Sequence, residues 1–469
     1  MSIPSEILIY IFRLLDSPRD LSCCSQVCKD WYDASRDERL WLAWATHYQV
    51  PGVFQEPERE RHWREKERDK YGLWVHPRSF GLQFSASSAL GELKPAQEAF
   101  CQWYRVFRGF HAIFPRMANA VHRLSLWLRK ESPNTLMTLQ TGRYAIGDQG
   151  WLETMQMILD RMGHDMSVEH LQQTTTHSGM KELMLFYYFY DGQRAKLPYT
   201  DLGLFGCFTC YGQYTSLFML PSTYMKTEVI SGIRITIFAV CPRSGKFLGW
   251  VTEAAQMPEL LYHIVEVDET NGVYFSRGYF LSWFETYVSE LERNVYDTFG
   301  PDKAISMFPN EGPGTSRSVY KGIEVIASSI PALESNSASG VWIYRIKLRY
   351  IGGPGAPSSC QLLRRHWILT YRSGTVEHVR GDGVVGEQPI LNATSDSFTY
   401  CSICTGRELA TDNVEGGDDE MVHIHDPAVC MEGEFEFVVP SPAAPEQEIT
   451  FQVPVKRFFF RQVQSLPRD

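Results

Sequence analysis

The hydrophobic pattern of this 469-residue chain changes near residue 318, and the change limits how the C-terminal third can fold. Beyond that point, short runs of β-branched and aromatic residues are separated by turn residues. Such runs, repeated through roughly 150 residues, are typical of two packed antiparallel sheets. The runs are 322–329, 341–350, 365–371, 375–379, 397–402, 433–439 and 449–459. The sequence therefore predicts an antiparallel β-sandwich, with the acidic stretch 412–420 as a loop.

The first 45 residues predict short helices that carry much apolar surface. Ile7, Ile11 and either Leu14 or Leu15 recur at helical spacing after Pro4, and Ser17 precedes a proline as an N-cap residue does. A unit this short cannot bury all of its apolar side chains by itself and tends to need a partner. We therefore expect an exposed apolar patch made of Pro4, Ile7, Leu8, Ile11 and Phe12.

Residues 99–300 predict a mixture of helices and strands. Helices are expected at 151–162, ended by Gly163, and at 279–293, whereas 233–240 and 246–251 form a predicted hairpin. The aromatic run 184–190 fits either a strand or a helix closed by glycine, and its periodicity does not decide between them. Upstream, 46–98 predicts a solvated charged helix at 54–71, followed by a linker rich in Gly, Ser and Pro at 72–98. A recognition surface is the alternative interpretation of 54–71.

Composition limits the class of protein and its compartment. A net charge of −10 argues against a dedicated nucleic-acid binder and against adhesion to an anionic membrane. The apolar stretch 7–15 is too short and too charged to span a membrane or to act as a signal peptide. The 11 cysteines are odd in number and irregularly spaced, which indicates reduced thiols. We expect a cytoplasmic or nuclear protein without a targeting peptide.

One glycine-rich segment could bind an anion. Gly381-x-Gly383-x-x-Gly386 matches a dinucleotide-binding pattern, but a β-type stretch follows it where that fold needs a helix. A glycine-rich turn in the sandwich is one interpretation. The other is a nest of backbone amides that binds an anion or a diphosphate, built from Gly381, Gly383, Val384, Val385 and Gly386.

Two Cys-x-x-Cys pairs raise the question of zinc. Cys401 and Cys404 could join His425 and Cys430 in a set of four ligands. Residues three apart in a strand face opposite sides, however, which favours packed thiols over a metal site. The pair at 207 and 210 has no nearby histidine. Because metalloprotease and nucleophile-elbow motifs are also missing from the sequence, we expect no metal, no cofactor and no catalytic residue.

The N-terminal residues resemble an F-box, from Ile3-Pro4-x-Glu6-Ile7-Leu8 to Leu40-Trp41. F-boxes dock onto the Skp adaptor, which links them to cullin and RING subunits, so the resemblance implies the same partners here. The residues that it implies for adaptor binding are Pro4, Ile7, Leu8, Ile11, Phe12, Leu15, Leu21, Val27, Cys28, Trp31, Leu40 and Trp41.

Residues 318–465 resemble the ApaG domain, which has a fibronectin-III-like fold. The resemblance rests on 366–370, 376–389 and 398–402 together with 431–437, and the segment 407–430 is longer and more acidic than the family's hairpin. Residues 99–300 resemble the Smi/Knr-type (SUKH) domain, an α+β binding module without shared catalytic residues. The features that carry this second resemblance are Gly150-Trp151-x-x-x-Met155, Asp191-Gly192-Gln193 and the helix around Trp283.

These features predict a multidomain α+β protein with a helical F-box at 1–45, a SUKH-like domain and an ApaG sandwich, an order found in one group of F-box-only proteins. The leading hypothesis is a non-enzymatic subunit of a Skp–cullin–F-box (SCF) ubiquitin ligase that binds an unknown protein substrate. The alternative is a binding module gated by an anion at the glycine turn, and an enzyme with an unrecognised site is a third.

Overall fold

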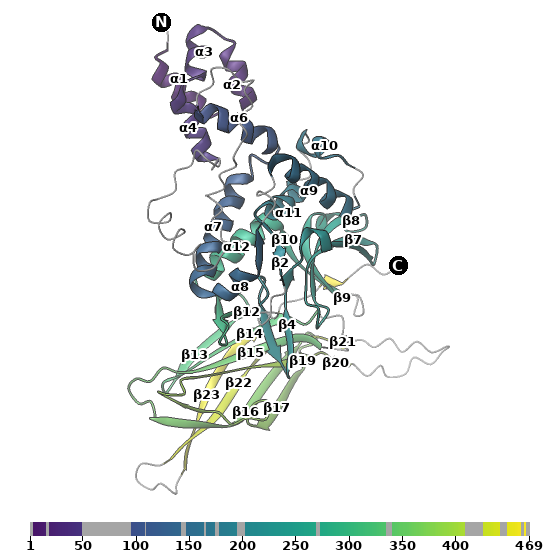
Figure 1. Ribbon diagram of the computed structural model, residues 1–469. Helices are drawn as coiled ribbons and strands as arrows, with labels where there is room; N and C mark the ends of the chain where they lie inside the picture. The colour runs from purple at the N-terminus through teal and green to yellow at the C-terminus, as the bar shows by residue number, and fades with distance from the viewer. Residues whose placement is uncertain are drawn as a thin grey trace, which may run out of the picture.

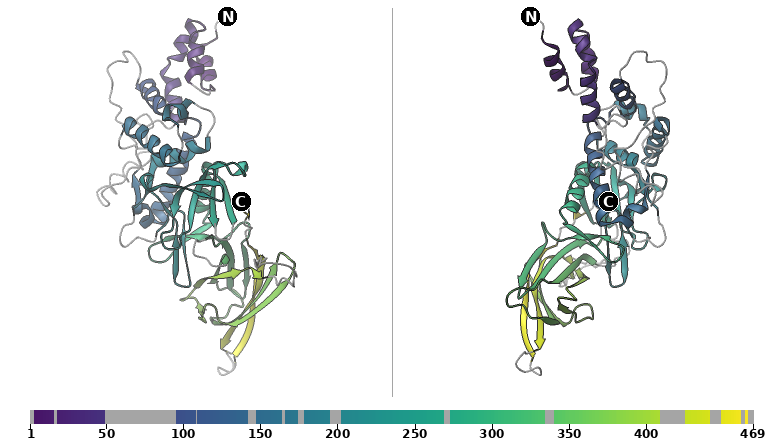
Figure 2. Two further views of the ribbon diagram at one scale, coloured as in Figure 1. Left: turned by 90° about the vertical axis from the view of Figure 1, so that its right-hand side faces the viewer. Right: turned by 60° about the vertical axis from the view of Figure 1, so that its left-hand side comes forward.

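The computed structural model arranges the chain as three packed regions in a row, with the N-terminal helices and the C-terminal sandwich at opposite ends (Figures 1 and 2). Ser17, the charged segment 54–71, the acidic loop 412–420 and most of the expected linker lie outside the described residues. The residues that the structure describes are 3–15, 18–48, 95–107, 109–141, 147–163, 166–173, 178–194, 202–268, 273–333, 340–408, 425–440, 448–460 and 464–465.

The N-terminal region consists of short helices, as the sequence predicts. They are α1 (Ser5–Phe12), α2 (Pro18–Ser25), α3 (Lys29–Ser35) and α4 (Glu38–His47). Leu8 and Phe12 on α1 are buried, and Phe12 packs edge-on against Trp31 with 5.5 Å between ring centroids. Asp37 caps α4, because its carboxylate accepts a hydrogen bond from the Arg39 amide.

The core of these helices continues into α6 (Pro95–Phe107), which begins inside the expected linker. Trp41 and Trp44 on α4 place their rings 5.6 and 5.5 Å from that of Phe100, measured between centroids. Phe100 and Trp103 are completely buried. An aromatic contact between α4 and α6 therefore attaches the N-terminal helices to the middle region.

The middle region packs a layer of helices on one face of an antiparallel sheet (Figure 1). The ring centroid of Phe186 lies 4.8 Å from that of Phe284, and the ring centroid of Phe238 in the sheet lies 5.9 Å from that of Phe280. Helices and sheet therefore share one core. The helices are α7 (Phe114–Glu131), α8 (Pro133–Thr138), α9 (Gly147–Arg161), α10 (Val168–Gln173), α11 (Ser178–Phe189) and α12 (Phe280–Glu292). The sheet runs β24-β10-β9-β8-β7-β5, with β6 also on β7. Its strands are β5 (Phe218–Met219), β6 (Lys226–Ile230), β7 (Ile233–Val240), β8 (Phe247–Ala254), β9 (His263–Asp268), β10 (Val273–Tyr279) and β24 (Gln464–Ser465).

The predicted helices and hairpin of the middle region are confirmed. α9 and α12 occupy the expected segments, and Gly163, at φ 73°, follows the end of α9 in the left-handed conformation. β7 and β8 form the hairpin, and its turn is closed by a 2.7 Å hydrogen bond from the Cys241 amide to the Lys246 carbonyl. The expected α+β character of this region is therefore correct.

The ambiguous run 184–190 is almost entirely helical. α11 ends at Phe189, and Tyr190 opens the short strand β2 (Tyr190–Gln193), which pairs with β1 (Leu139–Thr141). Gly192 lies within β2 at φ 81° instead of closing the helix. A Cβ atom at this position would lie 2.3 Å from the Pro221 nitrogen, so the close approach of the two backbones requires glycine.

A second, smaller sheet joins distant parts of the middle region and faces the sandwich. Its order is β11-β12-β3-β4, and β12 runs parallel to β3, with Ser306 opposite Cys207. The strands are β3 (Cys207–Cys210), β4 (Gln213–Ser216), β11 (Tyr296–Phe299) and β12 (Ala304–Pro309).

The C-terminal region is an antiparallel β-sandwich, and every strand that the sequence predicts there is present. The β15 sheet has the order β13-β14-β15-β19, and the β16 sheet has the order β17-β16-β22-β23, with β18 also on β16. The rings of Tyr344, Trp367 and Phe435 meet between the two sheets. The strands are β13 (Ser316–Tyr320), β14 (Ile323–Pro331), β15 (Gly340–Tyr350), β16 (Ser359–Tyr371), β17 (Val376–Asp382), β18 (Ile390–Asn392), β19 (Ser397–Thr405), β22 (Ala428–Pro440) and β23 (Glu448–Phe459), beside the short pair β20 (Arg407–Glu408) and β21 (His425–Asp426).

The outer face of the β15 sheet packs against the middle region through a buried arginine. Arg345 places Nη1 3.1 Å from Asp297 Oδ1 and 3.0 Å from Ser306 Oγ, and Nη2 2.7 Å from Asn310 Oδ1. Lys347 also pairs with Asp297. After the sandwich the chain returns to the middle region, where β24 pairs with β10. Among the described residues, no helix is both long and apolar enough to cross a membrane.

Candidate protein-binding surfaces

Helix α1 presents a row of exposed apolar side chains on the side that faces away from the core. Ile7 is 50% exposed, Tyr10 65% and Leu14 69%. Ile11 is exposed as well, and positions 7, 10 and 11 fall on one side of the helix. Ile3 is exposed just before α1, and Leu14 lies in the turn that follows it. We call these five residues the α1 stripe. A contiguous exposed apolar surface of this kind marks an interaction site.

The structure divides the residues expected to bind the adaptor into surface and core. Those on the surface are Pro4, Ile7, Ile11, Val27 and Cys28, and those half-buried are Leu15 and Trp31. Those in the core are Leu8, Phe12, Leu21, Leu40 and Trp41.

The expected exposure of Leu8 and Phe12 is wrong, because both sides of α1 are apolar and these two residues face α3 and α4. Tyr10 and Leu14 were not predicted as site residues. Their spacing of three and seven residues from Ile7 is the signal that could have identified them.

The glycine-rich turn after β17 uses its amides within the protein. The Gly383 amide donates to the Leu363 carbonyl at 2.7 Å, and the Val384 and Glu387 amides donate to each other's carbonyls at 2.8 Å. Arg365 holds the turn from the side through the Gly383 carbonyl at 2.7 Å. An anion nest needs successive amides that point at one ligand. This geometry favours the structural interpretation of the turn.

The other residues proposed for that nest belong to the sheet, the core or the tip of the turn. Gly381 pairs with Arg365 within the ladder of β16 and β17, and the Val384 side chain is completely buried in the sandwich core. Val385 and Gly386 form the exposed tip, both at positive φ. A Cβ atom at Gly383 would lie 2.4 Å from the Glu387 carbonyl oxygen, so substitution there would distort the turn itself.

The cysteine pair on β19 faces two different cores. Cys404 packs inside the sandwich, whereas Cys401 packs against the contact with the middle region. Burial raises the pKa of each of these thiols to about 12, so both stay protonated at neutral pH. The side chain of His425 lies outside the described residues. Among those described, no group of three or more His, Cys, Asp or Glu residues is placed to hold a metal ion.

Comparison with protein families identifies the two ends of the chain. Residues 1–43 match the F-box-like family, and residues 332–416 match the ApaG domain. The F-box-like match includes α1, α2, α3 and the first part of α4, and the ApaG match includes β15, β16, β17, β18 and β19 of the β-sandwich.

Two curated relatives agree with these matches. The F-box protein SKIP16 of Arabidopsis thaliana is 26% identical over 275 residues, which are 50% of this chain and 61% of the plant protein. The chain thus spans less than two thirds of that relative. Protein ApaG of Paramagnetospirillum magneticum is 34% identical over 113 residues, which are 22% of this chain and 83% of the bacterial protein. The crystal structure of the ApaA protein from Bordetella pertussis covers 34% of this chain and 100% of its own, at 23% identity and a TM-score of 0.20. Through its C-terminal sandwich the chain belongs to the ApaG family, and it carries an F-box-like domain at the opposite end.

Proposed function

We propose that this chain is the substrate-recognition subunit of an SCF-type E3 ubiquitin ligase and that its α1 stripe binds the Skp adaptor. The observation that carries the proposal is the exposed apolar row on α1 of an F-box-like domain. That domain stands at the far end of the molecule from the sandwich (Figure 1). One end is thus free to join a ligase while the other binds a target.

In this role the chain catalyses nothing itself. The complex would raise the effective concentration of a substrate lysine near a charged conjugating enzyme, which is catalysis by proximity. We further propose that the middle region is a SUKH-type module and that it presents the target together with the ApaG domain. None of the 11 cysteines, all of which the structure describes, forms a disulfide, which suits the reducing conditions of the cytoplasm or nucleus, where we place the protein.

The test is adaptor binding by the full chain with Ile7→Glu and Leu14→Glu. Both side chains are already exposed, so neither change disturbs the core of the helices. A charge introduced into an apolar interface should weaken binding by roughly 2–4 kcal/mol, the range of interface hot spots. Isothermal titration with purified adaptor measures the affinity.

Val229→Glu is the matched control, because Val229 is an exposed apolar residue on β6 of the middle region. It should leave adaptor affinity unchanged. If the two α1 variants bind the adaptor as tightly as the unmodified chain does, the α1 stripe is not the docking surface. If the unmodified chain shows no adaptor binding at all, the ligase role itself is wrong.

A further inference from the structure

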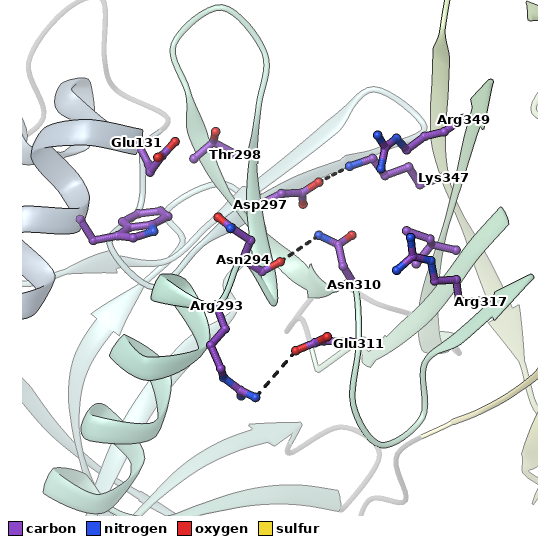
Figure 3. Close-up of a pocket in the computed structure, with 12 residues that line it drawn as sticks. Glu131, Arg293, Asn294, Asp297, Thr298, Asn310, Glu311, Arg317, Lys347 and Arg349 are labelled. Carbon is purple, nitrogen blue, oxygen red and sulfur yellow. Dashed lines mark hydrogen bonds and ion pairs between the residues drawn. The ribbon is translucent and has the colours of Figure 1, made fainter. Parts of the chain in front are cut away.

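A groove of about 470 Å³ lies where the outer face of the β15 sheet meets the middle region. Figure 3 shows Arg317, Lys347 and Arg349 on one side and Glu131 of α7 on the other. Arg293, just beyond the end of α12, lines the groove as well. The volume suits a short peptide segment rather than a folded domain, since small-ligand clefts span roughly 300–1,000 Å³.

Strand geometry explains why these cations share one face. Alternate residues of a strand point to the same side, so Arg345, Lys347 and Arg349 of β15 all face outward from the sandwich. Within the sheet, Ile326 of β14 lies between Lys347 on one side and Arg317 of β13 on the other. The cations therefore form a cluster that spans three neighbouring strands.

On this side of the groove the cations outnumber the carboxylates with which they pair. Arg317 and Arg349 share Glu324, which is only 1% exposed, whereas the two arginine side chains are 65% and 47% exposed. Arg345 and Lys347 likewise share Asp297. Each pair of cations shares one carboxylate, which leaves an excess of positive charge on the outer face of the β15 sheet.

The arginines also keep hydrogen-bonding capacity for a ligand. Arg317 directs Nε and Nη2 to a single oxygen of Glu324, and Arg349 contacts the other oxygen through Nη1 at 3.2 Å. A guanidinium carries five N–H donors in a planar fork that matches a carboxylate or a phosphate. The acids across the groove already stand beside cations, because Glu131 lies 2.7 Å from Lys130 and Glu311 lies 3.7 Å from Arg293.

We propose that this groove binds an acidic peptide segment of the protein substrate, with Arg317, Lys347 and Arg349 receiving its oxyanions. The proposal rests on the proposed function and assigns a surface and a chemistry to substrate recognition. The oxyanions are carboxylates of Asp or Glu or phosphates on modified side chains, which offer the same acceptor geometry. A nucleic acid is disfavoured as occupant, because it would need a longer run of cations along its backbone than these three side chains supply.

Fluorescence anisotropy with the full chain tests the proposal. The probes are fluorescein-labelled peptides of equal length: hexaglutamate, a Gly-Ser peptide with two phosphoserines, and a neutral Gly-Ser peptide. We expect the acidic probes to bind and the neutral probe not to bind, with affinity that falls as salt rises. Comparison of the two acidic probes separates carboxylate from phosphate recognition.

Two groove variants sharpen the test. Arg349→Gln leaves Glu324 paired with Arg317, and the triple variant Arg317→Gln, Glu324→Gln, Arg349→Gln leaves no buried carboxylate without a partner. Loss of charge-assisted hydrogen bonds should weaken acidic-probe binding at least about tenfold in the triple variant. Arg364→Gln with Arg457→Gln removes two exposed arginines from the β16 sheet and should change the affinity less than twofold.

Equal affinity of both groove variants and the unmodified chain for the acidic probes would overturn the proposal, as would equal binding of the neutral probe. Thermal unfolding checks that each variant is folded. If the triple variant unfolds at a lower temperature than the unmodified chain, the affinity of Arg349→Gln for the acidic probes is the test. Adaptor affinity is measured on the same samples. Adaptor binding without acidic-probe binding rejects the groove alone, whereas acidic-probe binding without adaptor binding rejects the ligase role alone.

Discussion

Glu266 on β9 carries a negative charge inside the middle region and is almost fully buried together with its partner Lys246. Lys246 Nζ lies 2.9 Å from one carboxylate oxygen, and Arg277 contacts the other. Burial alone would raise the pKa of Glu266, but the two cations outweigh it and lower that pKa to about 2. Lys246 also donates a 3.1 Å hydrogen bond to the Pro331 carbonyl, so the cluster links the middle region to β14.

Replacement of Glu266 by glutamine should lower the free energy of unfolding at pH 7 by roughly 3 kcal/mol, because the buried Lys246 and the half-buried Arg277 lose the carboxylate that they share. The pKa of Glu266 is lower in the folded state than in the unfolded chain. Its contribution is therefore fully present above the unfolded pKa of about 4.3 and is lost as the pH falls through the folded value. The difference between variant and unmodified chain should shrink between pH 4.5 and pH 2, measured by urea unfolding.

Glu228→Gln is the control for this experiment. Glu228 pairs with Lys226 on the surface, where an ion pair contributes about 0–1 kcal/mol. If Glu266→Gln costs no more than this control at pH 7, the buried cluster does not stabilise the fold as argued.

At the scale of elements, Phe100 holds α4 and α6 together, because its buried ring contacts Trp41, Trp44 and Trp103. Phe100→Ala should remove about 3–5 kcal/mol of packing energy from this junction. Hydrogen exchange should then speed up in α4 and α6, while the sandwich strands stay protected. Leu126→Ala, at an exposed site on α7, should leave exchange in α4 and α6 unchanged. Unchanged protection of α4 in the Phe100 variant would show that α6 does not hold the N-terminal helices.

Strands of the sandwich could be predicted because alternation and turn residues are local signals. β14 and β15 lie close to their expected bounds for this reason. The short strand β13 was not predicted, since five residues carry too little periodicity. β18 was expected only as a β-type stretch without bounds after the glycine turn. The helix at 184–189 needed tertiary context, because its aromatic side chains suit either a strand or a buried helix.

The binding surfaces were less predictable than the elements. In α1, apolar residues occupy both sides of the helix, and only the packing of α3 and α4 decides that Phe12 faces inward and Ile7 outward. In β15, the spacing of Arg345, Lys347 and Arg349 predicts one common face, but not what lies opposite it. That requires the position of the sandwich relative to α7 and α12, which the sequence does not contain.

At the scale of the whole molecule, the function that we propose requires the target to be held at a fixed distance from the adaptor. The F-box helices and the sandwich lie at opposite ends (Figures 1 and 2), so the junctions between regions determine that distance. The junction at the sandwich depends on Arg345, whose guanidinium contacts Asp297, Ser306 and Asn310. Burial would raise the pKa of Asp297, but Arg345 and Lys347 outweigh it and hold that pKa below its ordinary value.

Arg345→Met should loosen this junction without unfolding the sandwich. Methionine keeps much of the side-chain length and leaves Asp297 paired with Lys347, while the hydrogen bonds to Ser306 and Asn310 are lost. We expect a cost of about 3 kcal/mol, the lower range for a broken buried pair. Small-angle scattering of the full chain should give a larger radius of gyration, and hydrogen exchange should speed up in β11 and β12. Arg364→Met, on the exposed face of the β16 sheet, should change neither measurement. Identical scattering and exchange in the Arg345 variant would mean that the remaining contacts, among them those of Phe208, Phe308 and Ile343, hold the two regions together without Arg345.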